Sequence, residues 1–462
     1  MSTPDLALGL DAPRRIHIIG IGGAGMSAIA TVLAGMGHDV GGSDLKDSPA
    51  LARLRLLGVR TEVGHRPEHI DPDLDAVVVS TAIRDDNVEV AAARDRDVPV
   101  LRRAALLRAI VATQRTIAVA GSHGKTTTSS MLALVLRAAG WHPSFVIGGE
   151  VNEVGTNAVY DTGEWLVVEA DESDGTFLEL APEVGVVTSV DPDHLDHYGG
   201  FDGLVAAFER FLEGVPGLRV VCVDDPVAAR LAQDAGARTY GFAVEADYRI
   251  DEYQGTRTGS RFGLVARGVP LGAIELPIPG RHNARNAVAA AATALELGAP
   301  FDAVVHALAG FGGVARRFQF RGEVDGVTFV DDYAHLPAEV AAAIHTAKEG
   351  GWPRVVAVFQ PHRYTRTASL WRDFADAFAE ADSVVLTDVY SAGETPQPGV
   401  SGRLVLRAVL DAHPALPVTY LPRRADLVGN VLRLARPGDV VLTLGAGDLT
   451  TLPDEWIAAG SR

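Results

Sequence analysis

Residues 120–128, Ala-Gly-Ser-His-Gly-Lys-Thr-Thr-Thr, have the types and spacing of a phosphate-binding loop. They follow an apolar, strand-like segment, 116–119, and precede a helix-like segment, 129–139. A glycine-rich turn between a strand and a helix directs backbone N–H groups at a phosphate, and the helix N-terminus adds partial positive charge. Lys125 can reach the β- and γ-phosphates of a nucleotide, and a threonine hydroxyl can bind Mg²⁺.

This loop departs from the general phosphate-binding pattern at one position. The pattern requires glycine where the chain has Val119, so Gly121 and Gly124 must supply the flexibility. The alternative is a turn that only caps a helix, but such a turn has little use for a lysine between a glycine and three threonines. We therefore predict an ATP site.

A second glycine-rich turn, 20–25, lies between a strand-like segment and a helix-like segment near the start of the chain. Gly20, Gly22 and Gly25 have dinucleotide-binding spacing, and Asp44 follows at the distance expected for a ribose contact. The pattern predicts a pyrophosphate on the helix N-terminus. It does not decide between NAD and another nucleotide diphosphate such as a UDP-sugar. Glycines that serve only tight strand–helix packing are the alternative.

Two acidic loops, 169–174 and 191–197, each follow a predicted strand. Mg²⁺ prefers oxygen ligands and usually binds through one or two carboxylates together with substrate phosphates. One carboxylate from such a loop, with a threonine of the phosphate-binding loop, would complete a metal–ATP site. The alternative is a solvated acidic rim.

Basic and polar groups gather in the second half of the chain. In the segment 280–286, Asn283 is expected to cap a following alanine-rich helix, 283–297, whereas Asn286 could contact a base or ribose. The segments 331–335 and 360–366 follow strand-like runs and are rich in histidine, arginine and aspartate. Such side chains at strand ends suit carboxylate or phosphate binding.

Composition and charge restrict the classes of partner. A net charge of −18 over 462 residues argues against nucleic acid or an anionic membrane as the main partner. The single cysteine, Cys222, allows neither an intramolecular disulfide nor a cysteine zinc site. We see no signal-peptide segment in residues 1–15 and no apolar run that could span a bilayer, so we expect a cytoplasmic protein without membrane insertion.

Alternation of strand-like and helix-like segments predicts an α/β fold with doubly wound parallel sheets. The strand-like segments that follow one another at 240–279 are shorter and suggest a small antiparallel sheet. We place domain boundaries so that the domains are 1–110, 111–315 and 316–462.

Taken together, the motifs resemble those of the Mur ligase family, and the run from Gly20 to Met26 is similar to its alanine-adding branch. The matching runs are 20–26, 121–128, 169–174, 193–196, 280–286, 311–318, 331–335 and 359–367. The resemblance implies a Rossmann-like N-terminal domain for UDP-substrate binding, a central P-loop ATPase-like domain and a C-terminal Rossmann-like domain for amino-acid binding. It implies ATP and Mg²⁺ as cofactors and UDP-N-acetylmuramate and L-alanine as substrates, joined through an acyl phosphate in peptidoglycan synthesis.

The resemblance also implies roles for individual residues. The expected catalytic residues are Lys125, His194, Arg317, His335 and Arg363. The expected ATP contacts are Gly121, His123, Gly124, Lys125, Thr126, Thr127, Asn283, Asn286, Arg317 and Asp332, and the expected metal ligands are Thr126, Glu172 and His194. The expected UDP-side contacts are Gly22, Ala24, Gly25, Asp44, Ser80 and Thr81. The expected amino-acid and acyl-phosphate contacts are Tyr333, His335, His362, Arg363 and Arg366.

Two positions depart from the family pattern. Leu336 stands where the alanine-adding branch commonly has a second histidine, and Phe208 stands where some relatives have a carbamylated lysine, so we expect no carbamate. The alternatives are a ligase that recycles a ready-made peptide onto the same UDP-sugar, a nicotinamide oxidoreductase, and a nucleotide-binding regulator without synthetic activity.

Overall fold

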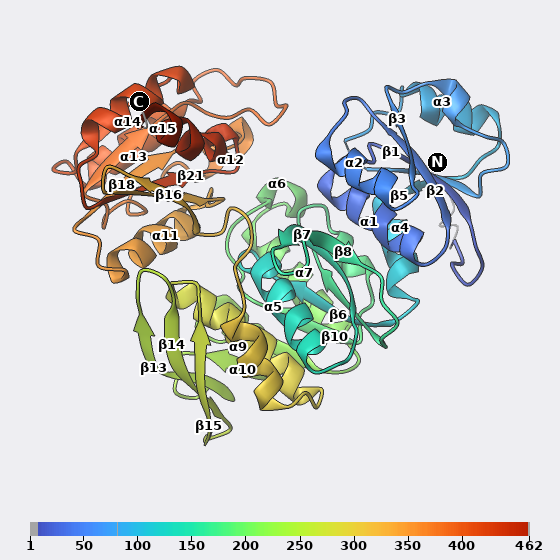
Figure 1. Ribbon diagram of the computed structural model, residues 1–462, viewed down its shortest axis with the longest axis horizontal. Helices are drawn as coiled ribbons and strands as arrows, with labels where there is room; N and C mark the ends of the chain where they lie inside the picture. The colour runs from blue at the N-terminus through green and yellow to red at the C-terminus, as the bar shows by residue number, and fades with distance from the viewer. Residues whose placement is uncertain (1–7, 81, 461–462) are drawn as a thin grey trace. The chain divides into compact units, whose positions relative to one another are not determined.

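The computed structural model describes residues 8–80 and 82–460 (Figure 1). The chain divides into two compact units, Met1–Arg249 with Ala287–Ala307, and Ile250–Asn286 with Leu308–Arg462. Three β-sheets, built mainly from parallel strands with intervening helices, confirm the predicted α/β class.

The first sheet, drawn in blue in Figure 1, is wholly parallel. Its elements are β1 (Arg15–Ile19), α1 (Ala24–Gly35), β2 (Asp39–Asp44), α2 (Pro49–Leu56), β3 (Arg60–Val63), β4 (Ala76–Val79), α3 (Val88–Asp95), β5 (Val100–Arg102) and α4 (Arg103–Val111). The strand order is β3-β2-β1-β4-β5, so the order reverses between β1 and β4. Open α/β sheets bind ligands at such a switch point, outside the carboxyl ends of the strands. The glycine turn after β1 lies there.

The central sheet of the first unit has β6 near its middle. Its elements are β6 (Arg115–Ala120), α5 (Lys125–Ala138), β7 (Ser144–Val151), β8 (Thr156–Val159), β9 (Trp165–Glu169), β10 (Val184–Val187), α6 (Leu195–Tyr198), α7 (Phe201–Glu213), β11 (Arg219–Cys222), α8 (Pro226–Asp234) and β12 (Arg238–Gly241). The order is β12-β11-β10-β6-β9-β7-β8, and β6 pairs in parallel with both β9 and β10. The phosphate-binding loop therefore lies between the two acidic loops that follow β9 and β10.

Three further elements contain residues of both units: β13 (Tyr248–Gly255), α9 (Arg281–Glu296) and α10 (Phe301–Ala309). The start of β13 pairs in parallel with β12 through Tyr248 and Arg249, whereas β14 (Ser260–Ala266) and β15 (Val269–Leu276) pair antiparallel. The prediction of a small antiparallel sheet over 240–279 is thus correct for the pairing of β14 with β15 and wrong for the pairing of β12 with β13, and all four strands belong to one sheet.

The third sheet, in the second unit, has the order β16-β17-β21-β18-β19-β20. The remaining elements of that unit are β16 (Gln319–Val324), β17 (Val327–Asp332), α11 (Pro337–Glu349), β18 (Arg354–Phe359), α12 (Tyr364–Leu370), β19 (Ser383–Leu386), α13 (Gly402–Ala412), β20 (Val418–Tyr420), α14 (Leu427–Leu434), β21 (Asp439–Leu444) and α15 (Leu452–Gly460). Alternate residues of β18 enter separate cores on the two faces, with Val355 and Phe359 in one and Val356 and Val358 in the other. Burial on both faces explains the continuous apolar run of this strand.

Three element boundaries differ from the sequence prediction in ways that affect the site. Helix α5 begins at Lys125, so the lysine and the threonines form its first turn. Helix α9 begins at Arg281, so Asn283 lies inside the helix and does not cap it. Strand β17 extends to Asp332, so both aspartates that were predicted in a loop are buried in the sheet. No helix in residues 8–80 and 82–460 is long and apolar enough to cross a membrane.

Candidate active site

The phosphate-binding loop is held in shape by β10 and the residues that follow it. Gly121 has φ +133°, and a Cβ there would collide with Thr188 and the backbone of Ser189. Ser122 exchanges hydrogen bonds with the backbone of Asp191, and the His123 N–H donates to Ser189 Oγ. Gly124, with φ +79°, precedes α5 without a capping side-chain hydrogen bond. The first N–H groups of α5 are therefore available to a phosphate.

Lys125 forms a buried ion pair with a carboxylate of the first acidic loop. Its Nζ lies 2.9 Å from Glu172 Oε1 and 2.7 Å from Oε2, and it donates to the carbonyl of Gly121 at 2.6 Å. Burial lowers the pKa of the Lys125 ammonium, but the charges of Glu172 and Asp171 outweigh burial and leave that pKa above its usual range. The lysine is thus charged and positioned where the sequence predicts a phosphate.

Glu169 is a functional candidate that the sequence prediction left out of its ligand set. The Thr126 hydroxyl donates to Glu169 Oε1 at 2.9 Å, and the Gly148 N–H donates to Oε2 at 2.6 Å. Glu169 therefore contacts the Thr126 hydroxyl, which is expected to bind metal, while Glu172 forms the ion pair with Lys125. The signal in the sequence was the register of β9, which ends at Glu169 beside the loop after β6.

Two aspartates of the second acidic loop pair with histidines, one in the phosphate-binding loop and one in the acidic loop itself. His123 Nε2 lies 2.9 Å from Asp191 Oδ2, and His194 Nε2 lies 3.2 Å from Asp193 Oδ2. His194 has φ +52°, a conformation stabilised by the hydrogen bond from its own N–H to Asp193 Oδ1. Within the described residues, no three His, Cys, Asp or Glu side chains are arranged to hold a metal ion by themselves.

The donor set around Thr126 fits Mg²⁺ only as part of a ternary site. A hydroxyl and carboxylates are the hard oxygen ligands that Mg²⁺ prefers, and Mg²⁺ commonly completes its shell with phosphates and water. Thr126, Glu169 and Glu172 supply such oxygens beside a loop that would hold the phosphates. The residues present therefore fit a metal that arrives with a nucleotide.

The glycine turn after β1 and Asp44 are brought together as predicted. The Gly22 N–H donates to Asp44 Oδ2 at 2.9 Å, and the N–H groups of Gly20 and Ile21 donate to the carbonyl of Ser43. A Cβ at Gly22 would meet both Asp44 and Leu51, so the close approach requires glycine. The turn is thereby fixed to the end of β2.

Other predicted UDP-side residues lie at the same sheet edge. Ala24 and Gly25 form the first turn of α1, and Ser80 follows β4. Thr81 lies outside the described residues. Beside Gly25, Arg103 forms an ion pair of 2.7 Å with Asp174 of the first acidic loop. Burial would raise the pKa of Asp174, but hydrogen bonds from Thr176 and the pair with Arg103 lower it.

In the second unit, Tyr333 lies beneath two guanidinium groups. Arg316 and Arg317 lie 4.7 Å and 5.3 Å from the centre of the Tyr333 ring. Asp332 accepts hydrogen bonds of 2.7 Å from the N–H groups of Phe318 and Ala334. Burial raises the pKa of the Asp332 carboxyl to about 6, against the attraction of Arg317. Asp332 thus fastens the segment that carries both arginines to β17.

His335 and His362 form the centre of a second cluster. His335 Nδ1 lies 3.1 Å from the carbonyl of Tyr333 and 3.3 Å from Glu339 Oε2, so two oxygen atoms lie beside that nitrogen. Arg366 Nη1 lies 3.1 Å from His362 Nδ1. Burial, helped by the charge of Arg366, lowers the pKa of His362 to about 3, so this imidazole is neutral.

The remaining residues around this cluster also have defined positions. The ring of His362 stacks on Tyr390 at 5.7 Å, and Arg363, with φ +69°, donates its N–H to the Tyr390 carbonyl. Tyr390 was not among the predicted residues. Leu336, in the place of the family histidine, is buried at the start of α11.

The segment 280–286 is packed into the protein. The Asn283 side chain donates to the carbonyl of Pro279 at 2.7 Å, and Asn286 Nδ2 lies 3.5 Å from Asn283 Oδ1.

Phe208 is fully buried against Phe177, with ring centres 5.2 Å apart. The structure therefore uses Phe208 as a core residue.

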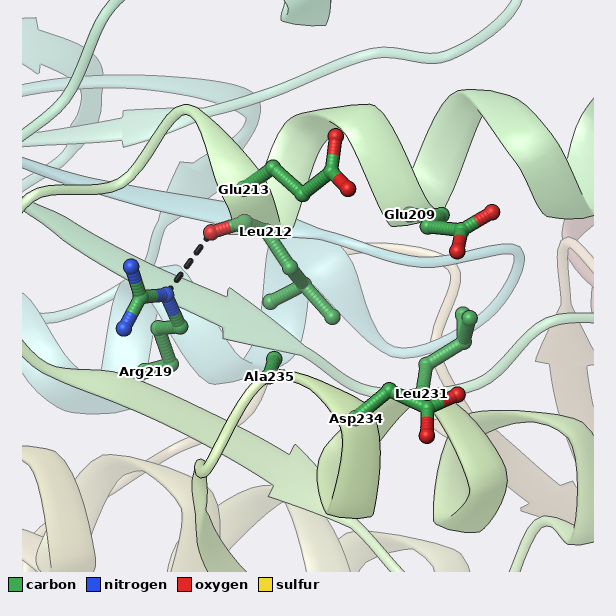
Figure 2. Close-up of a pocket in the computed structure, with 7 residues that line it drawn as sticks. All are labelled: Glu209, Leu212, Glu213, Arg219, Leu231, Asp234 and Ala235. Carbon is green, nitrogen blue, oxygen red and sulfur yellow. Dashed lines mark hydrogen bonds between the residues drawn. The ribbon is translucent and has the colours of Figure 1, made fainter.

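A pocket of about 250 Å³ in the first unit lies apart from the phosphate-binding loop (Figure 2). It is lined by residues of α7 and α8 with Arg219 of β11, which donates to the Leu212 carbonyl. Figure 2 shows the carboxylates of Glu209, Glu213 and Asp234 among the side chains that line it. None of the predicted site residues lines this pocket.

Comparison with known proteins identifies the class to which this fold and site belong. Residues 15–115 match the catalytic domain of the Mur ligase family, residues 119–294 the Mur ligase middle domain, and residues 316–447 the Mur ligase glutamate ligase domain. The chain belongs to the Mur ligase family, which confirms the resemblance found in the motifs.

Individual relatives extend over almost the entire chain. The UDP-N-acetylmuramate–L-alanine ligase of Bradyrhizobium sp. (strain BTAi1) is 48% identical over 461 residues, 96% of this chain and 98% of the relative. The protein of the same name from Pelotomaculum thermopropionicum is 47% identical over 445 residues, 95% of this chain and 96% of the relative.

Solved structures agree with this three-domain α/β fold. The UDP-N-acetylmuramate–alanine ligase of Thermotoga maritima matches with a TM-score of 0.80 at 30% identity, covering 97% of this chain and 99% of that chain. A murein peptide ligase from Psychrobacter arcticus matches with a TM-score of 0.70 at 23% identity, covering 97% and 99%, and shares the fold.

Proposed function

We propose that this chain is an ATP-dependent ligase that joins L-alanine to the lactyl carboxylate of UDP-N-acetylmuramate. Curated relatives whose names state this activity are 47% and 48% identical to it over nearly their whole length. The structural observation that carries the proposal is the loop before α5, where Lys125, Thr126 and two glutamates converge. The reaction belongs to peptidoglycan precursor synthesis, and we place it in the cytoplasm.

The chemistry requires activation of a carboxylate. The γ-phosphate of ATP passes to a lactyl carboxylate oxygen, giving an acyl phosphate and ADP. The amine of L-alanine then attacks the acyl carbon, a tetrahedral intermediate forms, and inorganic phosphate leaves as the amide is made. Positioning and neutralisation of charge supply most of the catalysis in such phosphoryl and acyl transfers.

In this proposal Lys125 exchanges partners when nucleotide binds. Without nucleotide its ammonium is neutralised by Glu172. The β- and γ-phosphates would replace that carboxylate on Lys125, helped by the N–H groups of Gly124, Thr126 and Thr127 at the start of α5. Glu172 would then be released beside the phosphates as a ligand for their metal.

We propose Thr126, Glu169 and Glu172 as oxygen ligands for Mg²⁺, with His194 as the further ligand that family resemblance implies. Bound there, Mg²⁺ would neutralise charge on the transferring phosphate. Glu169 holds the Thr126 hydroxyl in place through a 2.9 Å hydrogen bond. His123, oriented by Asp191, is proposed to contact the phosphates.

At the other end of the substrate, we propose that the glycine turn after β1 binds the diphosphate of UDP-N-acetylmuramate. Gly22 precedes α1, and Ala24 and Gly25 begin this helix, whose N-terminus favours anions. In the proposal Asp44, which accepts the Gly22 N–H, contacts the ribose. Ser80 and Thr81 complete this set in the proposal.

In the second unit we propose that Tyr333, His335, His362, Arg363 and Arg366 bind the amino acid and the acyl phosphate. Two arginines at a strand end suit a carboxylate and a phosphate. Neutral His362 keeps this site from adding further positive charge near the attacking amine. Arg317, Asp332, Asn283 and Asn286 are proposed contacts on the ATP side. The proposed domains are 1–110, 111–315 and 316–462.

Phosphate release tests the proposal directly. The chain is supplied with ATP, Mg²⁺ and UDP-N-acetylmuramate, and either L-alanine or the L-alanyl-γ-D-glutamyl-diaminopimelate tripeptide is added. Release that depends on L-alanine supports the proposal. Release only with the tripeptide identifies a recycling ligase, and release with neither amine contradicts both. NADH binding to the first domain would revive the oxidoreductase alternative.

A further inference from the structure

A buried carboxylate in the first sheet domain has no role in the site described above. Glu89, the second residue of α3, has no exposed surface. Its Oε2 accepts from Ser43 Oγ at 2.5 Å and lies 3.3 Å from His17 Nε2. Its Oε1 accepts from the Arg66 N–H at 3.1 Å and lies 2.6 Å from His69 Nδ1. Four groups from three segments of the domain, β1, β2 and the connection after β3, therefore converge on one side chain.

A third imidazole joins this network through Ser43. His65 Nδ1 lies 2.9 Å from Ser43 Oγ and 3.5 Å from Glu89 Oε2. Because Ser43 donates its proton to Glu89, its oxygen accepts from His65, which assigns a proton to His65 Nδ1. Three histidines surround the carboxylate, yet no group of this kind among the described residues has an arrangement that could hold a metal.

Glu89 is ionised in this environment. Burial alone would raise its pKa, but hydrogen bonds from His17, Ser43 and the Arg66 N–H outweigh burial and lower the pKa of Glu89 to about 2. Its position in the first turn of α3 adds the favourable field of a helix N-terminus. A carboxylate, which only accepts hydrogen bonds, is the side chain that matches this ring of donors.

The network is tied directly to the glycine turn. Ser43, which donates to Glu89, also accepts the N–H groups of Gly20 and Ile21 through its backbone carbonyl, at 2.8 Å and 3.0 Å. The next residue, Asp44, accepts the N–H of Gly22. His65, Arg66 and His69 belong to the connection after β3, at the same carboxyl edge of the sheet.

We propose that Glu89 is a positioning residue for the nucleotide end of the UDP-sugar substrate. It fixes Ser43, and through Ser43 the glycine turn and Asp44, against the connection that follows β3. The charge of Glu89 therefore sets the geometry of the diphosphate and ribose contacts without touching the substrate. This inference rests on the proposed function for the location of the nucleotide.

The test compares Glu89→Gln with a matched control, Asp75→Asn. The amide of glutamine presents a donor to a ring of donors while keeping the size of the side chain. Asp75 also accepts a backbone N–H of the first strand, that of Arg15 at 2.8 Å, but it does so at the amino end of β4, opposite the glycine turn. A general loss of domain stability would affect both variants, whereas a positioning role is specific to Glu89.

Calorimetric titration measures the affinities for UDP, for UDP-N-acetylmuramate and, separately, for ATP. Because Glu89→Gln replaces one buried acceptor with a mismatched group, we expect this variant to bind UDP and UDP-N-acetylmuramate at least about tenfold more weakly than the parent. The affinity for ATP stays within about twofold of the parent, because its loop lies in another sheet. In turnover, the KM for UDP-N-acetylmuramate rises while kcat at saturating substrate is largely kept. Asp75→Asn keeps the parent affinities and KM.

Parent-like binding of UDP by folded Glu89→Gln overturns the inference, as does an equal loss in Asp75→Asn. If Glu89→Gln does not fold, Ser43→Ala is used in its place, because it removes only the hydroxyl that connects Ser43 to Glu89. Parent-like UDP affinity in Ser43→Ala overturns the proposal. The parent chain separates the two hypotheses. If the parent binds UDP but not UDP-N-acetylmuramate, the proposed substrate is contradicted, and the UDP affinity of Glu89→Gln relative to the parent still tests the role of Glu89. If the parent binds neither ligand, the proposed function and the role of Glu89 are both refuted.

Discussion

Replacing Glu172 with glutamine tests whether Lys125 must exchange a carboxylate for phosphate. In the structure both oxygens of Glu172 lie within 2.9 Å of Lys125 Nζ, and both side chains are largely buried. Glu172→Gln keeps the shape and one acceptor but removes the charge. We expect the nucleotide-free protein to lose stability and metal-free ATP to bind more tightly.

The magnitude follows from the geometry of the pair. Opposite charges at this distance attract by about 6 kcal/mol at an effective dielectric constant of about 20. Removing one partner of a buried pair typically costs about 3–5 kcal/mol, and the remaining amide acceptor recovers about 1 kcal/mol. We therefore expect a loss of about 3 kcal/mol in the free energy of unfolding, or roughly 6–12 °C in the transition of the first unit.

The two readouts are thermal unfolding and calorimetric titration with ATP in the presence of EDTA. Because Glu172 no longer competes for Lys125, metal-free ATP should bind at least about tenfold more tightly, which corresponds to about 1.4 kcal/mol. The gain in affinity on adding Mg²⁺ should be smaller than in the parent, since one carboxylate ligand is lost. Saturating ATP should restore most of the lost thermal stability.

Glu179→Gln is the matched control, because Glu179 lies a few residues further along the same segment and is exposed. It should leave both readouts unchanged. The exchange model is refuted by a Glu172→Gln protein with parent stability and parent affinity for metal-free ATP. A variant that is destabilised but binds metal-free ATP less tightly refutes the competition between Glu172 and phosphate alone.

Three further predictions concern the same site and the second unit. Lys125→Ala should lower turnover by at least about a thousandfold through loss of a phosphate contact, measured as ADP release; turnover near that of the parent contradicts the role of the lysine. Glu169→Gln should raise the Mg²⁺ concentration required for half-maximal turnover by about tenfold or more, and an unchanged requirement removes Glu169 from the ligand set. Because burial raises the pKa of Asp332 from 3.8 to about 6, its contribution makes the fold more stable as pH falls through 6 toward 4. His362, whose pKa falls from 6.5 to about 3, contributes the opposite trend over pH 6.5 to 3. For Asp332→Asn and His362→Gln, the measurement is the difference in urea midpoint between variant and parent at pH 7 and at pH 5. From pH 7 to pH 5 this difference should change in opposite directions for the two variants, and a change in the same direction contradicts the assignment.

The order of strands and helices was predictable because the inner strands of these parallel sheets are buried on both faces. Segments such as Arg354–Phe359 and Asp439–Leu444 have continuous apolar runs, which are typical of such strands. Boundaries next to charged residues were less predictable. Asp331 and Asp332 continue β17 because Thr443, Thr450 and the N–H groups of Phe318 and Ala334 satisfy their carboxylates inside the fold. Thr443 and Thr450 are 112 and 119 residues away from Asp331 in the sequence, so no local pattern contains them.

The candidate site shows the same limit. The phosphate-binding loop and the acidic loops were predictable because the carboxyl ends of neighbouring parallel strands meet at one edge. Which glutamate faces Thr126 and which faces Lys125 depends on the residue at which β9 ends, and adjacent residues of a strand point to opposite faces. The Glu89 network was not predicted, because its donors come from segments up to 72 residues away.

The distribution of charge explains how a chain of net charge −18 can hold anionic substrates. In the first unit, the groups that we propose to bind phosphate are backbone N–H groups at the starts of α1 and α5, which carry no net charge, and one lysine that is neutralised by Glu172. Such a site has little long-range attraction for an anion but offers several short-range donors. Affinity then depends on the position of the donors to within fractions of an ångström, which gives a physical reason for fixing one glycine turn with Glu89 and Asp44 and the other with Thr188 and Asp191. Binding at either loop should accordingly be far less sensitive to ionic strength than to substitution of these anchoring residues.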